Sequence, residues 1–129
     1  TYKRMRNPAK VYLVDIGLCR RISSVDAGRL LENIVFLELK RKGFEVFYFD
    51  EERECDYIAK GEDNKLLPIQ VSFDLTEENS EREMGGLTEA CNGLNLKEGI
   101  ILTYDEEKEA DINGIHVKIL PVWKWLILS

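Results

Sequence analysis

The chain has 129 residues, of which 44% are hydrophobic and 33% are charged, and its formal net charge is −6. That length suits one domain with its own hydrophobic core, and no apolar run is long enough to span a bilayer, so no membrane partner is expected. The first ten residues hold four basic side chains and no acidic one, so the rest of the chain is more acidic than the total indicates. An acidic body disfavours broad, nonspecific binding to nucleic acid, because the phosphate backbone repels it.

Three cysteines, Cys19, Cys55 and Cys91, are widely spaced among hydrophobic residues and form no CxxC pair. This usage is typical of reduced thiols in a core, and it predicts a cytoplasmic protein without a zinc site. From these residues we expect no signal peptide. The sequence begins with Thr1 rather than Met, so we expect it to be a piece of a longer protein, with residues 1–9 as a linker or N-terminal arm.

The first predicted elements are a short strand, a short helix or turn, and a long helix. β-forming residues alternate in Lys10–Asp15, which predicts the strand, and residues 16–24 follow as the short helix or turn. Ser24 is suited to capping the long helix, which runs to about Lys42 and ends at Gly43. Apolar residues wrap most of this helix, so we expect it to be covered on more than one side.

Three strand signals follow, separated by short polar turns, at Phe44–Phe49, Cys55–Lys60 and Leu66–Phe73. Their short connections predict an antiparallel meander. A second helix is predicted to start at Ser80, because Ser80 and Glu83 have the spacing of a capping box, and to run to about Leu94. The pair Gly85-Gly86 inside it lowers helix propensity and predicts a kink or close packing.

The last part of the chain is predicted to hold two strands and a short helix. Gly99–Thr103 is a continuous apolar run, typical of a buried strand reached by a crossover helix. Residues 105–111 are predicted to form a charged loop, 115–119 a half-exposed strand, and Pro121–Leu128 a short helix. The sequence therefore predicts a single α/β domain over residues 1–129, with a mixed central sheet, flanking helices and the core order αβββαβ.

Four polar residues form the candidate site. In Leu66–Phe73 the odd-numbered residues are all apolar, so Gln70 and Ser72 share the opposite face of that strand. Asp56, on the preceding strand, needs only to pair near them for three polar side chains to converge. Glu32 lies on the long helix among apolar neighbours, where a carboxylate is costly unless it is hydrogen-bonded or bound to a metal.

The arrangement resembles a modified metal-dependent nuclease site. Many such enzymes combine a helix acid, a strand acid and a Glu-x-Lys pair to hold Mg²⁺ and to activate the attacking water. Here Gln70 and Ser72 occupy the positions of that last pair, so the lysine is absent and one carboxylate is an amide. Gln70 can still offer an oxygen to a metal, whereas a lost positive charge would have to come from Lys60, Lys65 or Arg82.

Three segments resemble, in order and context, the C-terminal domain of unknown function that follows the ATPase module in many archaeal and bacterial AAA-type ATPases: Gly28–Asn33, Glu54–Ile58 and Pro68–Ser72. The opening Lys10–Leu18 and the ending Pro121–Leu126 look like that family too. That family is similar in fold to the PD-(D/E)XK, or restriction-endonuclease-like, superfamily. The resemblance matches Glu32 to the helix acid, Asp56 to the strand acid, and Gln70 and Ser72 to the last acid and the catalytic lysine.

The resemblance implies a degenerate, non-catalytic nuclease-like domain at the C-terminal end of an ATPase. Its expected role is to recognise DNA or a protein partner, or to hold subunits of the parent ATPase together as a homo-oligomer. No P-loop motif is present in these residues, so ATP would bind only in an upstream domain. Two alternatives stay open: a DNA nuclease dependent on Mg²⁺ or Mn²⁺ with Glu32, Asp56 and Gln70 as metal ligands, and a purely structural scaffold.

Overall fold

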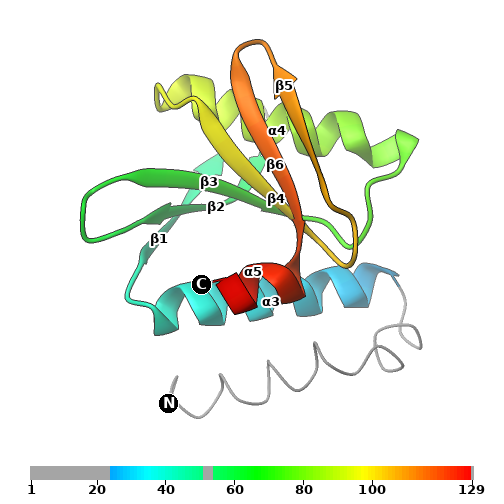
Figure 1. The fold of residues 1–129 in the computed structure, drawn as a ribbon, viewed down its shortest axis with the longest axis horizontal. Helices are drawn as coiled ribbons and strands as arrows, with labels where there is room; N and C mark the ends of the chain where they lie inside the picture. Colours follow the sequence, from blue (N-terminus) through cyan, green and yellow to red (C-terminus); the bar gives the residue numbers. More distant parts are fainter. Residues whose placement is uncertain (1–23, 51–53, 129) are drawn as a thin grey trace.

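The computed structural model describes residues 24–50 and 54–128 and forms a mixed α/β fold, with a six-stranded mixed sheet and three helices in those ranges (Figure 1). In chain order the elements are α3 (Ser24–Arg41), β1 (Glu45–Asp50), β2 (Glu54–Lys60), β3 (Leu66–Val71), α4 (Glu77–Gly93), β4 (Glu98–Thr103), β5 (Lys108–Ile112), β6 (Ile115–Pro121) and α5 (Val122–Leu128). The predicted strand Lys10–Asp15, the predicted turn or short helix after it up to residue 23, and Cys19 lie outside the described residues.

The strands lie in the order β1-β2-β3-β4-β6-β5. β1, β2 and β3 form the predicted antiparallel meander. Helix α4 then carries the chain across the sheet, so that β4 lies parallel to β3, and β6 lies parallel to β4 on its other side. The run from α3 to β4 therefore has the predicted order αβββαβ, in which tight turns give antiparallel neighbours and a crossover helix gives a parallel one.

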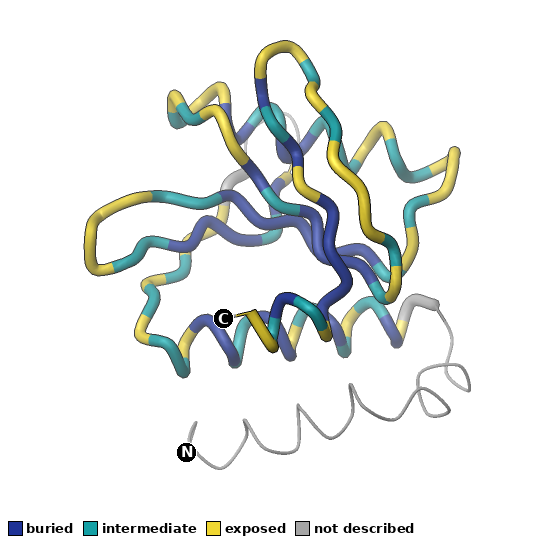
Figure 2. The backbone as a smooth tube through the Cα atoms, viewed as in Figure 1, coloured by how far each residue is buried: buried dark blue, intermediate teal, exposed yellow. Residues whose placement is uncertain are grey.

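The sheet separates two hydrophobic cores. The ribbon shows α3 and α5 on one side of the sheet and α4 on the other (Figure 1), and much of the sheet between them is buried (Figure 2). On one face, α3 and α5 pack against the sheet through residues such as Val35 and Trp125, which share one core with Ile69 and Val71 of β3. On the other face, α4 packs through Leu87 and its neighbours against the middle strands. None of the helices in the described ranges is long and apolar enough to cross a membrane.

Helix α3 ends as predicted, at a glycine. Gly43 has a φ of +87°, a conformation that residues with a side chain rarely adopt. Its N–H donates to the carbonyl of Lys40 at 3.0 Å, and the N–H of Phe44 donates to the carbonyl of Leu39 at 3.0 Å. These two bonds form a Schellman motif, which satisfies the last carbonyls of the helix and turns the chain into β1.

The start of α4 differs from the prediction. The helix begins at Glu77, about one turn earlier, because Thr76 is its N-cap. The N–H of Asn79 donates to Oγ1 of Thr76 at 3.2 Å, and the N–H of Thr76 donates to Oδ1 of Asn79 at 2.8 Å. This pair is the capping box, so the predicted box of Ser80 and Glu83 is wrong. Glu83 lies inside the helix, where its carboxylate is available for other contacts.

The segment predicted as a charged loop is also different. It contains most of β5, which pairs antiparallel with β6 at the outer edge of the sheet. Lys108, Glu109 and Asp111 of this strand are exposed. Charged side chains are common on edge strands, because they oppose pairing with other chains. The charges that suggested a loop are therefore those of a protected edge.

Candidate functional site

The register of β2 and β3 brings Asp56 and Gln70 together, as the sequence predicted. Tyr57 pairs with Ile69, so the residues next to them face each other across the two strands. The backbone N–H of Asp56 donates to Oε1 of Gln70 at 2.8 Å, and the N–H of Val71 donates to Oδ2 of Asp56 at 2.8 Å. Each of these two polar side chains therefore accepts a hydrogen bond from the backbone of the other strand.

The Gln70 amide also reaches the neighbouring helix. Its Nε2 donates to the carbonyl of Glu54 at 3.0 Å and to the carbonyl of Glu83, in α4, at 3.3 Å. Gln70 is 3% exposed, and both ends of its amide bind backbone groups. We call Gln70 and its three backbone partners the Gln70 junction. A glutamate could not replace this amide, because a carboxylate has no hydrogen to donate to the two carbonyls.

Gly86 lets α4 approach the Gln70 junction closely. A Cβ atom at this position would lie 2.1 Å from the carbonyl oxygen of Glu54 and 2.6 Å from Nε2 of Gln70. Both distances are shorter than atoms in contact can tolerate. The close packing predicted from Gly85-Gly86 is therefore confirmed, and it explains why a helix interior carries a residue of poor helix propensity.

Three carboxylates gather beside the junction, and we call Glu32, Asp56 and Glu83 the carboxylate cluster. Glu32 comes from α3, which is tied to β2 because the hydroxyl of Tyr57 donates to the Glu32 carbonyl at 3.2 Å. Burial raises the pKa of Glu32, and the negative charges of Asp56 and Glu83 raise it further. Burial also raises the pKa values of Asp56 and Glu83, and the charge of Asp56 adds to the rise at Glu83. The charge of Asp56 therefore opposes the ionisation of both Glu32 and Glu83.

Arg82 supplies positive charge near the cluster. Its guanidinium lies 3.3 Å from the Glu83 carboxylate, and its charge works against the rise in the Asp56 pKa. The two lysines that could replace the missing positive charge lie away from the carboxylate cluster. Lys60 is four residues further along β2, which is roughly 13 Å in an extended strand. Lys65 is exposed in the turn between β2 and β3.

Ser72, which the sequence resemblance matched to a catalytic lysine, has a local structural role. It is buried, and its hydroxyl donates to the carbonyl of Asp74 at 2.7 Å. Its backbone N–H donates to the carbonyl of Leu102 at 2.9 Å, which extends the pairing of β3 with β4. The hydroxyl thus stabilises the turn that leaves β3.

The cluster in its present geometry does not fit a bound Mg²⁺ or Mn²⁺. Within residues 24–50 and 54–128, no three His, Cys, Asp or Glu side chains are arranged to hold a metal ion. In addition, Oδ2 of Asp56 and Oε1 of Gln70 already accept backbone hydrogen bonds. Ligation of a metal by Glu32, Asp56 and Gln70 stays a prediction.

Glu83 is the site residue that the sequence analysis did not assign. Its spacing from Ser80 suggested a capping box, and that interpretation assigned its carboxylate to capping the helix. Two signals pointed the other way. Thr76 and Asn79 have the same spacing one turn earlier, and Glu83 precedes Gly86 and Leu87 by three and four residues. Residues at that spacing share a helix face, and Gly86 and Leu87 are buried against the sheet.

The sequence has recognisable relatives. Over residues 27–125 it matches the family described as Domain of unknown function (DUF4143). It is 37% identical to an uncharacterized protein of Methanocaldococcus jannaschii and 31% identical to an uncharacterized protein of Haemophilus influenzae, over 91% and 92% of the chain. The chain spans only 29% of the length of each of these two relatives. Because the family match covers most of its length, this chain belongs to the DUF4143 family.

Proposed function

We propose that this chain is a restriction-endonuclease-like domain, of the PD-(D/E)XK type, whose catalytic centre has become a structural junction. In this proposal it serves an AAA-type ATPase as a non-catalytic C-terminal domain that recognises nucleic acid or protein, or holds subunits together. The αβββαβ order supports the fold assignment. A helix acid at Glu32 and a strand acid at Asp56, whose charge raises the pKa of Glu32, support the assignment of the former centre.

The observation that carries the proposal is the Gln70 junction. A nuclease of this type needs an acid and a cation at the positions of Gln70 and Ser72. Here the amide of Gln70 binds three backbone groups, and the hydroxyl of Ser72 binds a fourth. Loss of one charged group that stabilises a transition state typically lowers the rate by roughly 10²–10³. The side chains at both positions are therefore suited to stabilising the fold rather than to catalysis.

Calorimetry combined with cleavage assays tests this proposal. Mn²⁺ and Mg²⁺ are titrated into the 129-residue chain and into Asp56→Asn, which keeps the shape of the side chain while removing its charge. The same proteins are incubated with single- and double-stranded DNA in Mn²⁺. We expect no saturable heat and no cleavage above buffer for either protein. Saturable binding and cleavage that Asp56→Asn abolishes would overturn the proposal.

A metal-dependent DNA nuclease is the second candidate, and one observation favours it. Glu83 supplies a third carboxylate where Gln70 does not, and a divalent cation would relieve the mutual repulsion of the cluster. If this candidate is correct, cleavage in Mn²⁺ is lost in Glu83→Gln and kept in Glu81→Gln, an exposed control on the same helix. Equal activity of the two variants would exclude a role for Glu83.

A further inference from the structure

The hairpin of β5 and β6, at the outer edge of the sheet, places the single histidine of the chain opposite an acid (Figure 1). Asn113 and Gly114 join the two strands, with φ values of +51° and +83°. Positive φ at both central residues is typical of a two-residue hairpin turn, and Asn-Gly is the sequence that such a turn favours. The turn fixes the register of the strands, in which Asp111 pairs with His116.

The backbone pairing brings these two side chains close together. The N–H of His116 donates to the carbonyl of Lys97, just before β4, at 2.8 Å, so it points away from β5. Because N–H groups alternate in direction along a strand, the N–H of Val117 points toward β5, where Ala110 lies opposite. His116 and Asp111 therefore form a pair of the type that exchanges no backbone hydrogen bonds, in which the side chains lie closest.

Both ring nitrogens of His116 face carboxylates of β5. Nδ1 lies 3.2 Å from Oδ1 of Asp111, and Nε2 lies 3.7 Å from Oε1 of Glu109. A neutral imidazole has one N–H and can direct it to only one of these carboxylates, whereas the charged ring has an N–H for each. The arrangement of the two acids therefore fits the charged form of the ring.

The charges on the neighbouring strands favour the same form. Glu98 of β4 pairs with His116 on the side away from β5, so acids face the histidine from both adjacent strands. Lys118, two residues further along β6 on the same face, pairs with Glu109 and partly offsets these acids. The hydrogen bond to Asp111 raises the pKa of His116, and the charges of Asp111, Glu109 and Glu98 add to the rise, against desolvation, which lowers it.

We propose that His116 acts as a pH-sensitive switch that holds the edge strand β5 on the sheet while its ring is charged. Once the ring is neutral, three acids face one another with Lys118 as their cation, and β5, which pairs with β6 alone in the described residues, opens more often. Because the folded pKa is raised, the stabilisation is full below the ordinary value of about 6.5 and is lost as the pH rises through the raised one.

The opening of β5 would expose the backbone edge of β6, which β5 and its charged side chains otherwise keep from pairing with other chains. This inference does not rest on the proposed function. Strands β3 and β4 separate β2, which carries Asp56 of the carboxylate cluster, from the hairpin. The switch and metal-dependent cleavage can therefore be tested separately, and the failure of one leaves the other standing.

Nuclear magnetic resonance can follow both the titration and the opening in the 129-residue chain. The ring of His116 is titrated between pH 6 and pH 9, and amide hydrogen exchange at Ala110 and Val117 is corrected for the intrinsic exchange rate at each pH. We expect a midpoint above about 6.5. Opening at these amides should increase about threefold as the pH rises through the midpoint, since exposed ion pairs are weak. Amides of the central strand β3 report global unfolding and should change less.

Three variants separate the switch from a general effect of pH. His116→Gln keeps a polar side chain that cannot titrate, so the pH-dependent change at Val117 should disappear. Asp111→Asn removes the nearest acid and should lower the midpoint of His116. Asp63→Asn makes the same change in the exposed turn between β2 and β3 and should leave it in place. The proposal is overturned if the midpoint lies at or below about 6.5, if exchange at Val117 does not change or changes equally in His116→Gln, or if Asp111→Asn leaves the midpoint unchanged.

Discussion

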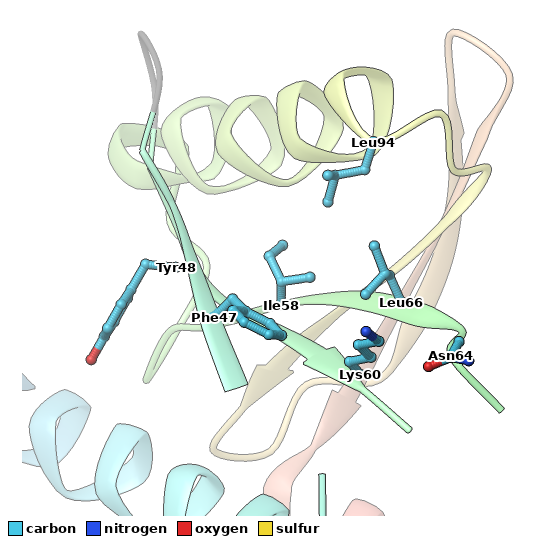
Figure 3. A pocket seen from close by; sticks show the side chains of 7 residues that line it. All are labelled: Phe47, Tyr48, Ile58, Lys60, Asn64, Leu66 and Leu94. Atoms are coloured by element: carbon cyan, nitrogen blue, oxygen red, sulfur yellow. The ribbon is translucent and has the colours of Figure 1, made fainter. Parts of the chain in front are cut away.

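The two ends of β2 differ in whether helix α4 covers their polar side chains. At the Asp56 end, α4 packs so closely that position 86 must be glycine, and the Gln70 amide binds backbone groups on three sides. At the Lys60 end, α4 has already ended, and an apolar hollow of about 370 Å³ lies open beside aromatic side chains of the edge strand β1 (Figure 3). The side chains at the first end therefore hold the fold together, whereas the aromatic side chains at the second end are exposed.

Gln70→Glu should give the largest loss of stability. The new carboxylate would face the carbonyls of Glu54 and Glu83 without a hydrogen to donate, next to the carboxylate cluster, so we expect a loss of roughly 3 kcal/mol at pH 8. Burial among acids raises the pKa of the introduced group in the fold. The loss should therefore be full above that folded pKa and shrink as the pH falls through it.

Urea unfolding at pH 8 and pH 5 measures this effect. Asn33→Asp makes the same amide-to-acid change at an exposed position of α3, and its effect should stay within about 0.5 kcal/mol. If Gln70→Glu is as stable as the original chain at pH 8, the junction does not hold the fold, and position 70 is free for a catalytic acid.

Gly86→Ala should cost about 2 kcal/mol, because its Cβ would overlap the Glu54 carbonyl and force α4 away from the sheet. Gly28→Ala is the matched control: it is also a helical glycine, but nothing lies within 4 Å of an added Cβ. That variant should gain up to about 1 kcal/mol from better helix propensity. Equal effects of the two substitutions in urea unfolding would contradict the close approach at the junction.

Two substitutions of Asp56 should change the stability of the fold in opposite directions. The raised pKa values of the carboxylate cluster mean that ionisation destabilises the fold, so stability should increase as the pH falls from 7 toward the folded pKa values. Asp56→Asn removes one charge and keeps an acceptor for the Val71 N–H. We expect it to gain on the order of 1 kcal/mol at pH 7 and to flatten the pH dependence.

Asp56→Ala removes the acceptor as well and should lose about 1 kcal/mol, since the Val71 N–H is then unpaired. Thermal unfolding of both variants between pH 5 and pH 8 makes the comparison. Similar losses in both would show that the charge of Asp56 stabilises the fold, against this account.

The smallest effect is expected at the open end. Phe47 is 46% exposed, so Phe47→Ser should cost less than about 1 kcal/mol of stability. Urea unfolding tests this, because a loss above about 2 kcal/mol would make Phe47 part of the core rather than an exposed side chain.

The sequence predicted the centre of the fold because its signals there are local. Alternation in β3 and short turns determine the pairing of β2 with β3, and with it the meeting of Asp56 and Gln70. Glu83 was not predicted, because its spacing from Ser80 suggested a capping box, and only the contacts of Asn79 show that the box forms at Thr76 instead. β5 was missed because a charged edge strand and a charged loop contain the same types of residue.

The open hollow could not be predicted from local patterns. It depends on where α4 ends relative to β1, and Gly86 determines how closely that helix approaches the sheet. Likewise, the sequence shows that Gln70 is an amide, but not that its Nε2 reaches the carbonyl of a helix thirteen residues away. Both features arise from packing between elements that are separate in the sequence.

The central claim is that the Asp56 end of β2 is structural, and a Mn²⁺ titration followed through backbone amide resonances tests it most directly. Mn²⁺ broadens the resonances of nearby nuclei, so the position of any bound ion can be mapped. The account predicts weak broadening spread over acidic surface residues, without saturation and without a centre at Asp56, Gln70 or Glu83. Saturable broadening centred on these residues, reversed by excess Mg²⁺ and absent in Asp56→Asn, would show a working metal site and contradict it.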